Sequence, residues 1–182
     1  KASAKSGIVS QMIYGDSFCV IKKKNKWKKI KIKEDNYLGF IKERKFTEYL
    51  KPTHKISVLS ANIFSKPNLK NKIGKLTFGS KIKIEKKINN FLGFQNIWVE
   101  AKNLKNISYR KKDLFSDIKI FNNVRYKWGG KTFKGIDCSA LVQIFLNFQN
   151  KLCPRDANDQ VKYFKKIISL KNIKKNDLIY WK

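Results

Sequence analysis

Apolar and polar residues alternate in short runs over the first part of the chain. Three such runs are residues 18–21, 27–32 and 37–41. An alternation with a period of two residues is typical of half-buried β-strands. Asn25 and residues 34–36 lie between the runs and are residue types that favour tight turns. The pattern therefore predicts three short strands joined by turns.

A related pattern returns 64 residues further along the chain. Residues 14–20 (YGDSFCV) and 78–84 (FGSKIKI) each show an aromatic residue, a glycine, a polar residue and then alternating apolar residues. Near the second copy, residues 55–64 and 91–99 each read as a strand, with a turn at Pro67-Asn68. Two copies built from short strands predict two small β-barrels in tandem. The alternative is one irregular β-sandwich in which the similarity of the two segments is a coincidence.

The pattern changes near residue 103. Residues 108–121 place apolar side chains at helical spacing, and residues 122–130 form a loop that ends in two glycines. Asp137-Cys138-Ser139 then leads into residues 140–148, which are apolar nearly all round, as in a helix buried inside a domain.

The last residues add one more helix and the beginning of a strand. Asp156 precedes residues 157–166 at the position of a helix N-cap, and residues 177–181 read as the start of a strand. The chain is therefore predicted to be an α+β protein in which two small β-barrels precede a partly helical domain. The predicted domain boundaries are 1–50, 51–107 and 108–182.

Composition excludes several classes of protein. With 42% hydrophobic residues among 182, the chain can build packed cores, which excludes wholesale disorder. No apolar run approaches the roughly 18–20 residues that a membrane helix needs, so no integral membrane protein is expected. The chain has only three cysteines, a small and odd number. A disulfide scaffold is therefore not expected, and reduced thiols are.

The net charge of +29 first suggests a nucleic-acid partner, because phosphate attracts any strongly basic protein. All but four of the 42 basic residues are lysines, however, and they are spread along the whole chain. Arginine is the preferred residue for bidentate contacts to phosphate and bases. Lys, Asn and Ile all have A/T-rich codons, so gene composition can produce this charge. We therefore expect a solvated lysine surface and no specific nucleic acid.

The candidate chemistry centres on Cys138. A thiol at the start of a helix is activated by free backbone N–H groups and by the positive end of the helix dipole. Cys138 lies directly before the predicted helix, and the same N–H groups could hold an oxyanion. The alternative is a small buried cysteine that only packs. We expect Cys19 and Cys153 to be packing residues.

These residues resemble a known family. The motifs are residues 126–130 (YKWGG), residues 135–143 (GIDCSALVQ) and residues 154–156 (PRD). They resemble the NlpC-type papain-like cysteine peptidases of bacteria, and the β units ahead of them resemble Src-homology-three-like barrels. That pairing is typical of γ-D-glutamyl-L-diamino-acid endopeptidases, which cut the stem peptides of peptidoglycan. The motifs that carry the resemblance lie between residues 126 and 160.

The resemblance implies a role for each matching residue. Cys138 would be the catalytic nucleophile, and Tyr126 would line the site and help to stabilise the tetrahedral intermediate. Asp137 and Ser139 would contact the bound peptide. Asp156 would bind the polar end of the substrate, as a free amine, or would only cap its helix. Gly129 and Gly130 would permit a close backbone approach at the cleft.

The chain also departs from the family's pattern. The family's cysteine needs a histidine base on a later strand, and this chain has one histidine, His54, in the second β unit, where a surface or packing role is expected. We expect the catalytic histidine beyond Lys182, with the peptidase domain truncated here. Ala140 replaces the family's usual glycine, a change that favours the helix.

The leading hypothesis is a cysteine peptidase that hydrolyses peptidoglycan stem peptides at the γ-D-glutamyl-diamino-acid bond, with no cofactor and no metal. Peptidoglycan-derived peptides are the expected partner, and a monomer is expected. A non-catalytic wall-binding protein, a basic nucleic-acid-binding protein and an acyltransferase are the alternatives. The cytoplasm is the expected compartment, because no signal peptide is visible, and export stays open if a segment precedes Lys1.

Overall fold

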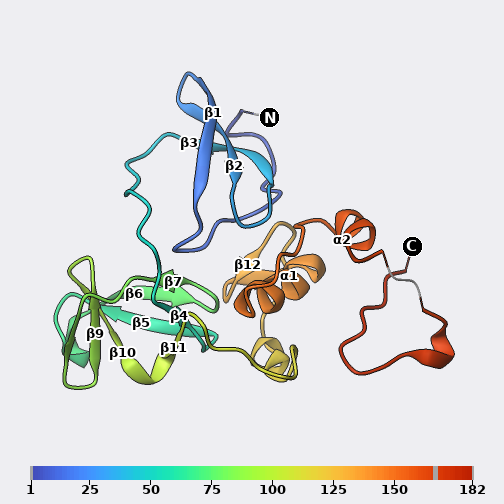
Figure 1. Cartoon of the computed structure of the whole chain (residues 1–182). Helices are drawn as coiled ribbons and strands as arrows, with labels where there is room; N and C mark the ends of the chain where they lie inside the picture. Colours follow the sequence, from blue (N-terminus) through green and yellow to red (C-terminus); the bar gives the residue numbers. More distant parts are fainter. Residues whose placement is uncertain (1, 166–167, 182) are drawn as a thin grey trace.

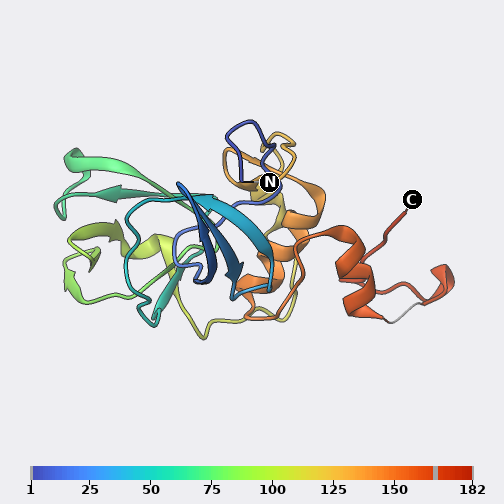
Figure 2. The same cartoon turned by 90° about the horizontal axis from the view of Figure 1, so that it is seen from above.

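The computed structural model describes residues 2–165 and 168–181. After an N-terminal segment (residues 2–13) come a first β unit (residues 14–42), a second β unit (residues 53–107) and a helical part (residues 108–181). In both views the first β unit lies over the junction between the other two (Figures 1 and 2). The predicted α+β class is confirmed.

The first β unit is an antiparallel sheet of strands β1 (Phe18–Lys24), β2 (Trp27–Ile32) and β3 (Leu38–Lys42), in that order. The predicted turns are confirmed, since Asn25 and Asn36 adopt left-handed φ values of 52° and 61°. Only Ile30 and Ile32 of these strands are fully buried. Among the described residues this sheet does not close into a barrel.

The second β unit has two sheets, with strand orders β6-β5-β10-β9-β8 and β11-β4-β7, and its described strands also form no single closed barrel. Its strands are β4 (His54–Ile56), β5 (Ser60–Phe64), β6 (Lys72–Thr77), β7 (Lys81–Ile82), β8 (Lys86–Ile88), β9 (Phe91–Phe94), β10 (Ile97–Glu100) and β11 (Leu104–Asn106). Short 3₁₀ turns occupy Leu69–Asn71 and Ala101–Asn103. The two sheets enclose a core of Ile56, Ala61, Leu76, Ile82, Phe94, Val99 and Leu104.

The sequence echo corresponds to a repeated backbone conformation. Gly15 and Gly79 both adopt positive φ, at 90° and 80°, in a turn that follows an aromatic residue and precedes a strand. The two copies also touch, because the backbone N–H of Lys81 donates to the carbonyl of Tyr14 at 2.9 Å. A Cβ at Gly15 would lie 2.2 Å from the Lys81 carbonyl oxygen, so only glycine fits there.

Two predicted strands of the second unit are each divided. Residues 55–64 form the end of β4 and all of β5, separated by a bend at residues 58–59. Residues 91–99 form the hairpin β9–β10, because Gln95 and Asn96 turn the chain with left-handed φ values of 44° and 61°. The apolar run had concealed this turn.

The helix predicted over residues 108–121 is wrong, and only a 3₁₀ turn at Ile118–Phe121 (η3) is present. The Asp113 carboxylate accepts a hydrogen bond from the Phe115 N–H at 3.3 Å, a local bond that competes with helix formation. The strand predicted over residues 177–181 is also wrong for these described residues, which pair with no other strand. Asp177 instead accepts from the Lys174 N–H at 2.7 Å and closes a turn.

The helical part contains the hairpin β12 (Lys131–Thr132) and β13 (Gly135–Ile136), helix α1 (Cys138–Phe148), helix α2 (Ala157–Phe164) and the 3₁₀ turn η4 (Leu170–Asn172). Helix α1 appears as predicted, and of its residues only Cys138 is exposed. Helix α2 ends at Phe164, where Lys165 adopts a left-handed φ of 52°. The predicted helix end at Lys166 lies outside the described residues.

One core is shared between the second β unit and the helical part. The Phe78 side chain extends from the second unit toward α1. Its ring centroid lies 4.6 Å from that of Phe148 and 5.1 Å from that of Phe145. Phe121 and Ile144 belong to the same buried cluster. Because aromatic rings bury large apolar areas, this cluster fixes α1 against the second β unit.

Candidate active site

Cys138 is the first residue of α1 and is exposed to solvent, whereas the next two residues, Ser139 and Ala140, are buried. The helix begins here because Asp137 is its N-cap: the backbone is extended at Asp137, and its carboxylate accepts from the Ala140 N–H at 2.8 Å. The thiol therefore lies at the positive end of the helix dipole.

Asp137 is a buried carboxylate whose two oxygens are both engaged. Arg155 donates to Oδ1 at 3.0 Å and to Oδ2 at 2.6 Å, and the Gly129 N–H donates to Oδ2 at 2.9 Å. Burial acts to raise the pKa of Asp137, but the Arg155 hydrogen bonds and charge and the two backbone N–H groups hold it below its ordinary value. The buried Asp137 side chain therefore holds the loop at Gly129 and the first turn of α1 together.

Ser139 belongs to the same buried network. Its hydroxyl accepts from Arg155 at 2.9 Å and lies 3.3 Å from the Asp137 carboxylate, to which it donates. The predicted contact of Asp137 and Ser139 with a peptide therefore stays a prediction, and these side chains are arranged to hold the helix start.

Arg155 was missed as a site residue by sequence reasoning. It is 2% exposed, and besides Asp137 it donates from Nε to the Ser10 hydroxyl at 3.1 Å. An arginine between Pro154 and Asp156 in a chain with very few arginines is the signal that could have singled it out. Arg155 thus joins the N-terminal segment to the start of α1.

Gln160 links α2 and the C-terminal residues to this network. Its amide nitrogen donates to the carbonyls of Ser139 and Pro154, both at 2.9 Å, and its oxygen accepts from the Tyr180 hydroxyl at 2.9 Å. Burial, followed by the nearby Cys153 and Cys138, raises the pKa of Tyr180 to about 12. Tyr180 therefore stays protonated at neutral pH.

Tyr126 lies on the strand-like segment beside β13, forms an isolated bridge with Ile136, and is 64% exposed. Its open ring is thus close in the fold to the loop that leads into Cys138. The two glycines in the following loop do permit a close approach of backbone, as expected. A Cβ at Gly129 would lie 2.4 Å from the Ile8 carbonyl oxygen, and one at Gly130 would lie 2.5 Å from the Gly135 carbonyl oxygen. They admit neighbouring backbone of this chain.

Asp156 occupies the N-cap position of α2, but its side chain makes no capping hydrogen bond, so the cap-only alternative loses its support. Burial raises its pKa above the ordinary value, and the Arg155 charge opposes this shift. Tyr37, on the loop before β3 of the first unit, faces it: burial first and then the Asp156 charge raise the pKa of Tyr37. Asp156 thus makes no capping bond and instead faces the Tyr37 hydroxyl and the Arg155 charge.

His54 lies near the C-terminal end of α1, the end opposite Cys138. It pairs with Asn106 and Ile82 in the sheet, and its Nδ1 lies 2.9 Å from the Thr53 hydroxyl. Its neighbour Lys55 reaches the carbonyl of Phe148, the last residue of α1. Eleven helical residues span roughly 16 Å, so His54 is remote from Cys138 and cannot serve as its base.

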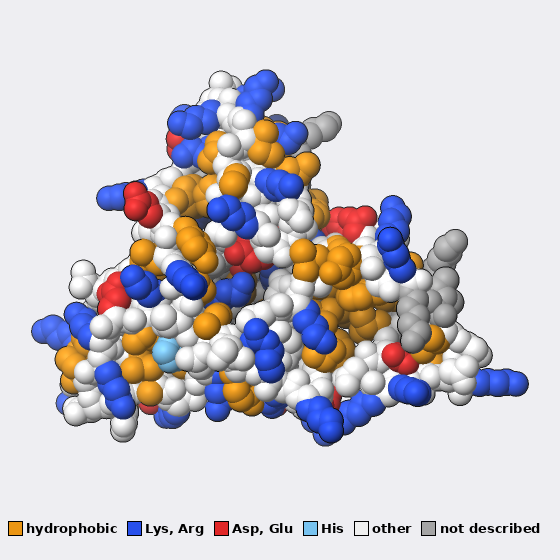
Figure 3. Space-filling view, viewed as in Figure 1, with side chains coloured by type: hydrophobic (Ala, Val, Ile, Leu, Met, Phe, Trp, Pro, Cys, Tyr) orange, Lys and Arg blue, Asp and Glu red, His pale blue; other side chains and the backbone are white. Residues whose placement is uncertain are grey.

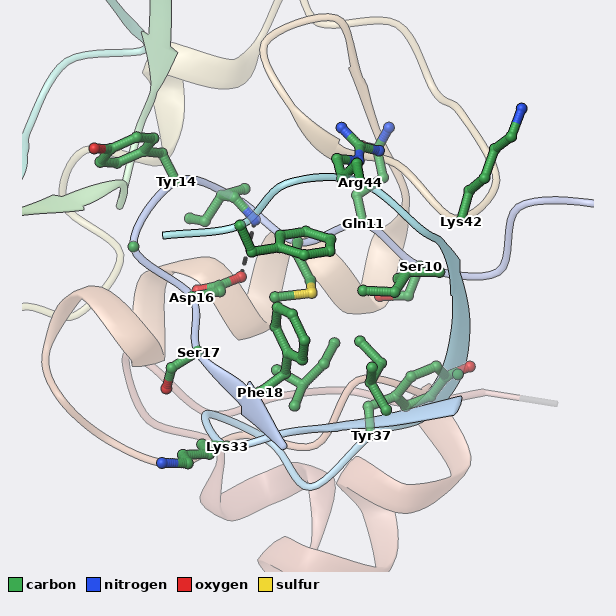
Figure 4. A pocket seen from close by; sticks show the side chains of 18 of the residues that line it. Ser10, Gln11, Tyr14, Asp16, Ser17, Phe18, Lys33, Tyr37, Lys42 and Arg44 are labelled. Atoms are coloured by element: carbon green, nitrogen blue, oxygen red, sulfur yellow. Dashed lines mark hydrogen bonds between the residues drawn. The ribbon is translucent and has the colours of Figure 1, made fainter. Parts of the chain in front are cut away.

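A pocket of about 1320 Å³ lies between the first β unit and the N-terminal segment. Figure 4 shows the Phe18 ring inside it, Tyr37 at one edge, and the Lys33 and Lys42 side chains extending away from its interior. Arg44 lies at its rim, and Phe94 of the second unit also lines it. Cys138 does not line this pocket, which makes it a separate feature.

The described residues hold neither a cluster of metal-ligating side chains nor a helix that could span a membrane. No group of three or more His, Cys, Asp or Glu side chains comes together there as a metal site. Within the same residues, neither helix has the length and apolar character needed to cross a membrane.

Comparison with known proteins gives two family matches. Residues 123–182 match the NlpC/P60 family, and residues 1–46 match the bacterial dipeptidyl-peptidase Sh3 domain. No curated protein matches the chain. These matches cover the part that carries Cys138 and the first β unit.

One of the matching solved structures supports the fold. An NlpC/P60 family protein from Bacillus cereus ATCC 10987 superposes with a TM-score of 0.77 at 18% identity, covering 91% of this chain and 63% of that one. NlpC2 and NlpC1 from Trichomonas vaginalis, both 18% identical, give TM-scores of 0.37 and 0.33 and cover 87% of this chain and 63% and 60% of theirs. The chain thus spans under two thirds of the length of these proteins.

Proposed function

We propose that this chain, which joins an NlpC/P60 domain to a bacterial Sh3 domain, is part of a cysteine peptidase that acts on peptides from peptidoglycan. The observation that carries the proposal is the exposed thiol of Cys138 at the first position of α1. The match of residues 123–182 to the NlpC/P60 family and the overall fold agree with it.

The proposed reaction starts with attack of the Cys138 thiolate on the scissile carbonyl carbon. In the tetrahedral intermediate the carbonyl oxygen carries a negative charge, which needs hydrogen-bond donors. The N–H groups of Ala140 and Leu141 are already bonded to Asp137. Those of Cys138 and Ser139 precede them in the first turn, where no intrahelical acceptor exists, and are the donors we assign to the oxyanion, with Tyr126 beside them.

Collapse of this intermediate breaks the C–N bond, releases the amine and leaves a thioester on Cys138, which water then hydrolyses. The thiol needs a base that takes its proton and returns it to the leaving amine. His54 is remote from Cys138, so we assign this role to a histidine that lies outside these 182 residues. The expected companion is a polar residue that orients it.

The proposed substrate is a stem peptide cut between γ-D-glutamate and the diamino acid. Asp156 supports this choice, because its carboxylate makes no capping bond and is available for the free amine of a short peptide. Tyr37 narrows the same region from the first β unit. Stem peptides carry several carboxylates, which a surface of +29 net charge would attract. We further propose a cytoplasmic monomer that recycles such peptides.

The test uses the full-length protein and the peptide L-Ala-γ-D-Glu-diaminopimelate. Cys138→Ala should reduce cleavage by at least about a thousandfold, since the nucleophile is lost. Cys19→Ala is the matched control: this cysteine is also exposed, but it lies on β1, and its variant should cleave normally. Unchanged turnover by Cys138→Ala would refute the assignment.

A wall-binding protein without peptidase activity is the second candidate, and the open pocket of the first β unit with Lys and Arg at its rim favours it. Sedimentation with purified peptidoglycan decides between the two in the same experiment. Co-sedimentation without release of peptide by the wild-type protein supports binding alone. The basic side chains seen in Figure 3 are spread over all parts of that face, so a nucleic-acid site has no comparable support.

A further inference from the structure

Lys55 is a buried lysine that the proposed chemistry does not use. It lies on β4 of the second unit, is 1% exposed, and its ammonium group points away from its own sheet toward the end of α1. Lysine is almost never fully buried unless its charge is compensated, so its position requires an explanation.

The surroundings of the ammonium group provide one. Lys55 Nζ donates to the carbonyls of Ile107 at 3.2 Å, of Tyr109 at 2.7 Å and of Phe148. An ammonium group has three N–H donors, and three carbonyl oxygens surround it, so the numbers match. The charge also lies 4.3 Å from the centroid of the Phe148 ring. No carboxylate forms a salt bridge with Lys55 in the described part of the chain.

The three carbonyls come from two different segments. Phe148 is the last residue of α1, where carbonyls lack intrahelical partners and carry the negative end of the dipole. The last turn of α1 contains no basic residue of its own, and Lys55 supplies that charge from another unit. The other two carbonyls belong to residues 107–109, which connect the second unit to the helical part.

Other bonds join the same two segments. The Asn150 amide donates to the Ile107 carbonyl at 3.1 Å, and the Gln149 side chain accepts from the Lys111 N–H at 2.8 Å. Arg110 donates to the carbonyls of Ile107 and Tyr109, the same two that Lys55 binds. Lys55 alone among these residues belongs to the β-sheet, so it connects this junction to a rigid strand.

We propose that Lys55 is a positioning residue: by binding the C-terminal end of α1 to the second β unit, it sets the position of Cys138 at the opposite end of the same helix. A helix of 11 residues behaves as a short rigid rod, so a shift at one end moves the other. The effect on catalysis by Cys138 rests on the function proposed above. The attachment of the end of α1 to the second β unit by Lys55, which we call the Lys55 clamp, does not.

The main experiment compares three variants of the full-length protein by hydrogen exchange. Lys55→Met removes the donors at similar length and should lower the protection of the last turn of α1 and of residues 107–111 about five- to tenfold, as expected for one or two lost hydrogen bonds. Lys55→Arg retains a cation with donors and should restore most of the protection. Lys105→Met is the matched control, because Lys105 pairs with Lys55 across β4 and β11 but is exposed.

Strands β5 and β10 provide the internal reference, since they lie in the other sheet of the second unit and should exchange equally in all variants. In the peptidase assay, Lys55→Met should lower kcat about tenfold and leave KM within about twofold, because substrate contacts remain. Unchanged exchange in α1 overturns the clamp. Faster exchange with unchanged kcat overturns the positioning of Cys138. If the wild-type protein shows no activity, the proposed function fails while the exchange result still decides the clamp.

A measurement on the wild-type protein covers the case in which Lys55→Met does not fold. Acetylation of lysines with a water-soluble ester at neutral pH should modify Lys105 at least tenfold faster than Lys55, because the Lys55 amine is buried and bonded. Equal rates for the two lysines would overturn the proposal.

Discussion

The two β units contain the same glycine turn, at Gly15 and Gly79, and yet pack differently. The first unit buries Ile30 and Ile32 of its three strands and borders a pocket of about 1320 Å³. The second unit encloses its own core between two sheets and extends Phe78 into the core of the helical part. A shared local pattern therefore does not produce equal packing, because packing depends on how many apolar side chains the neighbouring strands provide.

The units also touch the helical part in different ways. The second unit holds the C-terminal end of α1 through Lys55 and Phe78. The first unit contributes Asp35, whose carboxylate accepts from the buried Gln143 amide at 2.9 Å, and Tyr37, which faces Asp156. The second unit thus supports α1, while the first lies beside Asp156, the residue that we propose binds the substrate amine.

The largest expected effect tests the support that the second unit gives to α1 through Phe78. Phe78→Ala should lower the free energy of unfolding by about 3–5 kcal/mol, because it opens a cavity in the shared core. Phe40→Ala in the first unit, where the ring is 37% exposed, should cost less than about 1 kcal/mol. Urea unfolding of both variants measures the difference. Similar losses would show that the two units are equally packed.

A smaller effect concerns pH. Burial, followed by the charges of Arg110 and Lys81, lowers the pKa of Lys55 from 10.5 to about 8. Between those two values the unfolded chain binds more protons than the folded one, so the free energy of unfolding rises with pH. Relative to Lys55→Met, the wild-type protein should gain about 1–3 kcal/mol from pH 8 to pH 10.5.

Urea unfolding at several pH values measures this difference, and the variant removes the contributions of the other lysines. A difference that does not change with pH, or that falls as pH rises, would contradict the burial of a charged Lys55. Phe78 stabilises the junction through apolar packing. Lys55 joins the two parts through hydrogen bonds to three carbonyls, and burying its charge costs free energy.

The smallest expected effect tests recognition of the substrate amine by Asp156 of the helical part and Tyr37 of the first unit. Asp156→Asn should raise KM for a peptide with a free amine about tenfold, and Tyr37→Phe should raise it about two- to fivefold, because one charged and one neutral contact are removed. Asp159→Asn, in the exposed first turn of the same helix, is the control. Equal cleavage of the N-acetylated peptide would exclude recognition of the amine.

Much of the local structure could be read from the sequence. Alternation predicted the three strands of the first unit, Asn25 predicted a turn, and the apolar run after Asp137 predicted α1. The same reasoning failed at residues 108–121, where the Asp113 carboxylate accepts from the Phe115 N–H, a local bond that competes with a helix despite the helical spacing. It also failed at residues 177–181, since a strand exists only with a partner.

For the candidate site, the position before a helix singled out Cys138, and the resemblance to a family pointed to Asp137, Ser139, Tyr126 and Asp156. Neither indicated Arg155 or Gln160. The first group lies in short recognisable motifs. Arg155 becomes important only because folding buries it against Asp137 and Ser10, which is 145 residues away in the sequence. Long-range polar partners leave no periodic trace in a sequence.

The sequence by itself determined the start of α1, because an N-cap such as Asp137 needs only its own neighbours. It determined the tight turns at Asn25 and Asn36 for the same reason, since left-handed conformations depend on the residue in place. Only the tertiary structure decided that Gly129 makes room for Ile8 and that Lys55 binds the end of α1. Those contacts join residues far apart in the chain, and they exist only after hydrophobic packing has brought the units together.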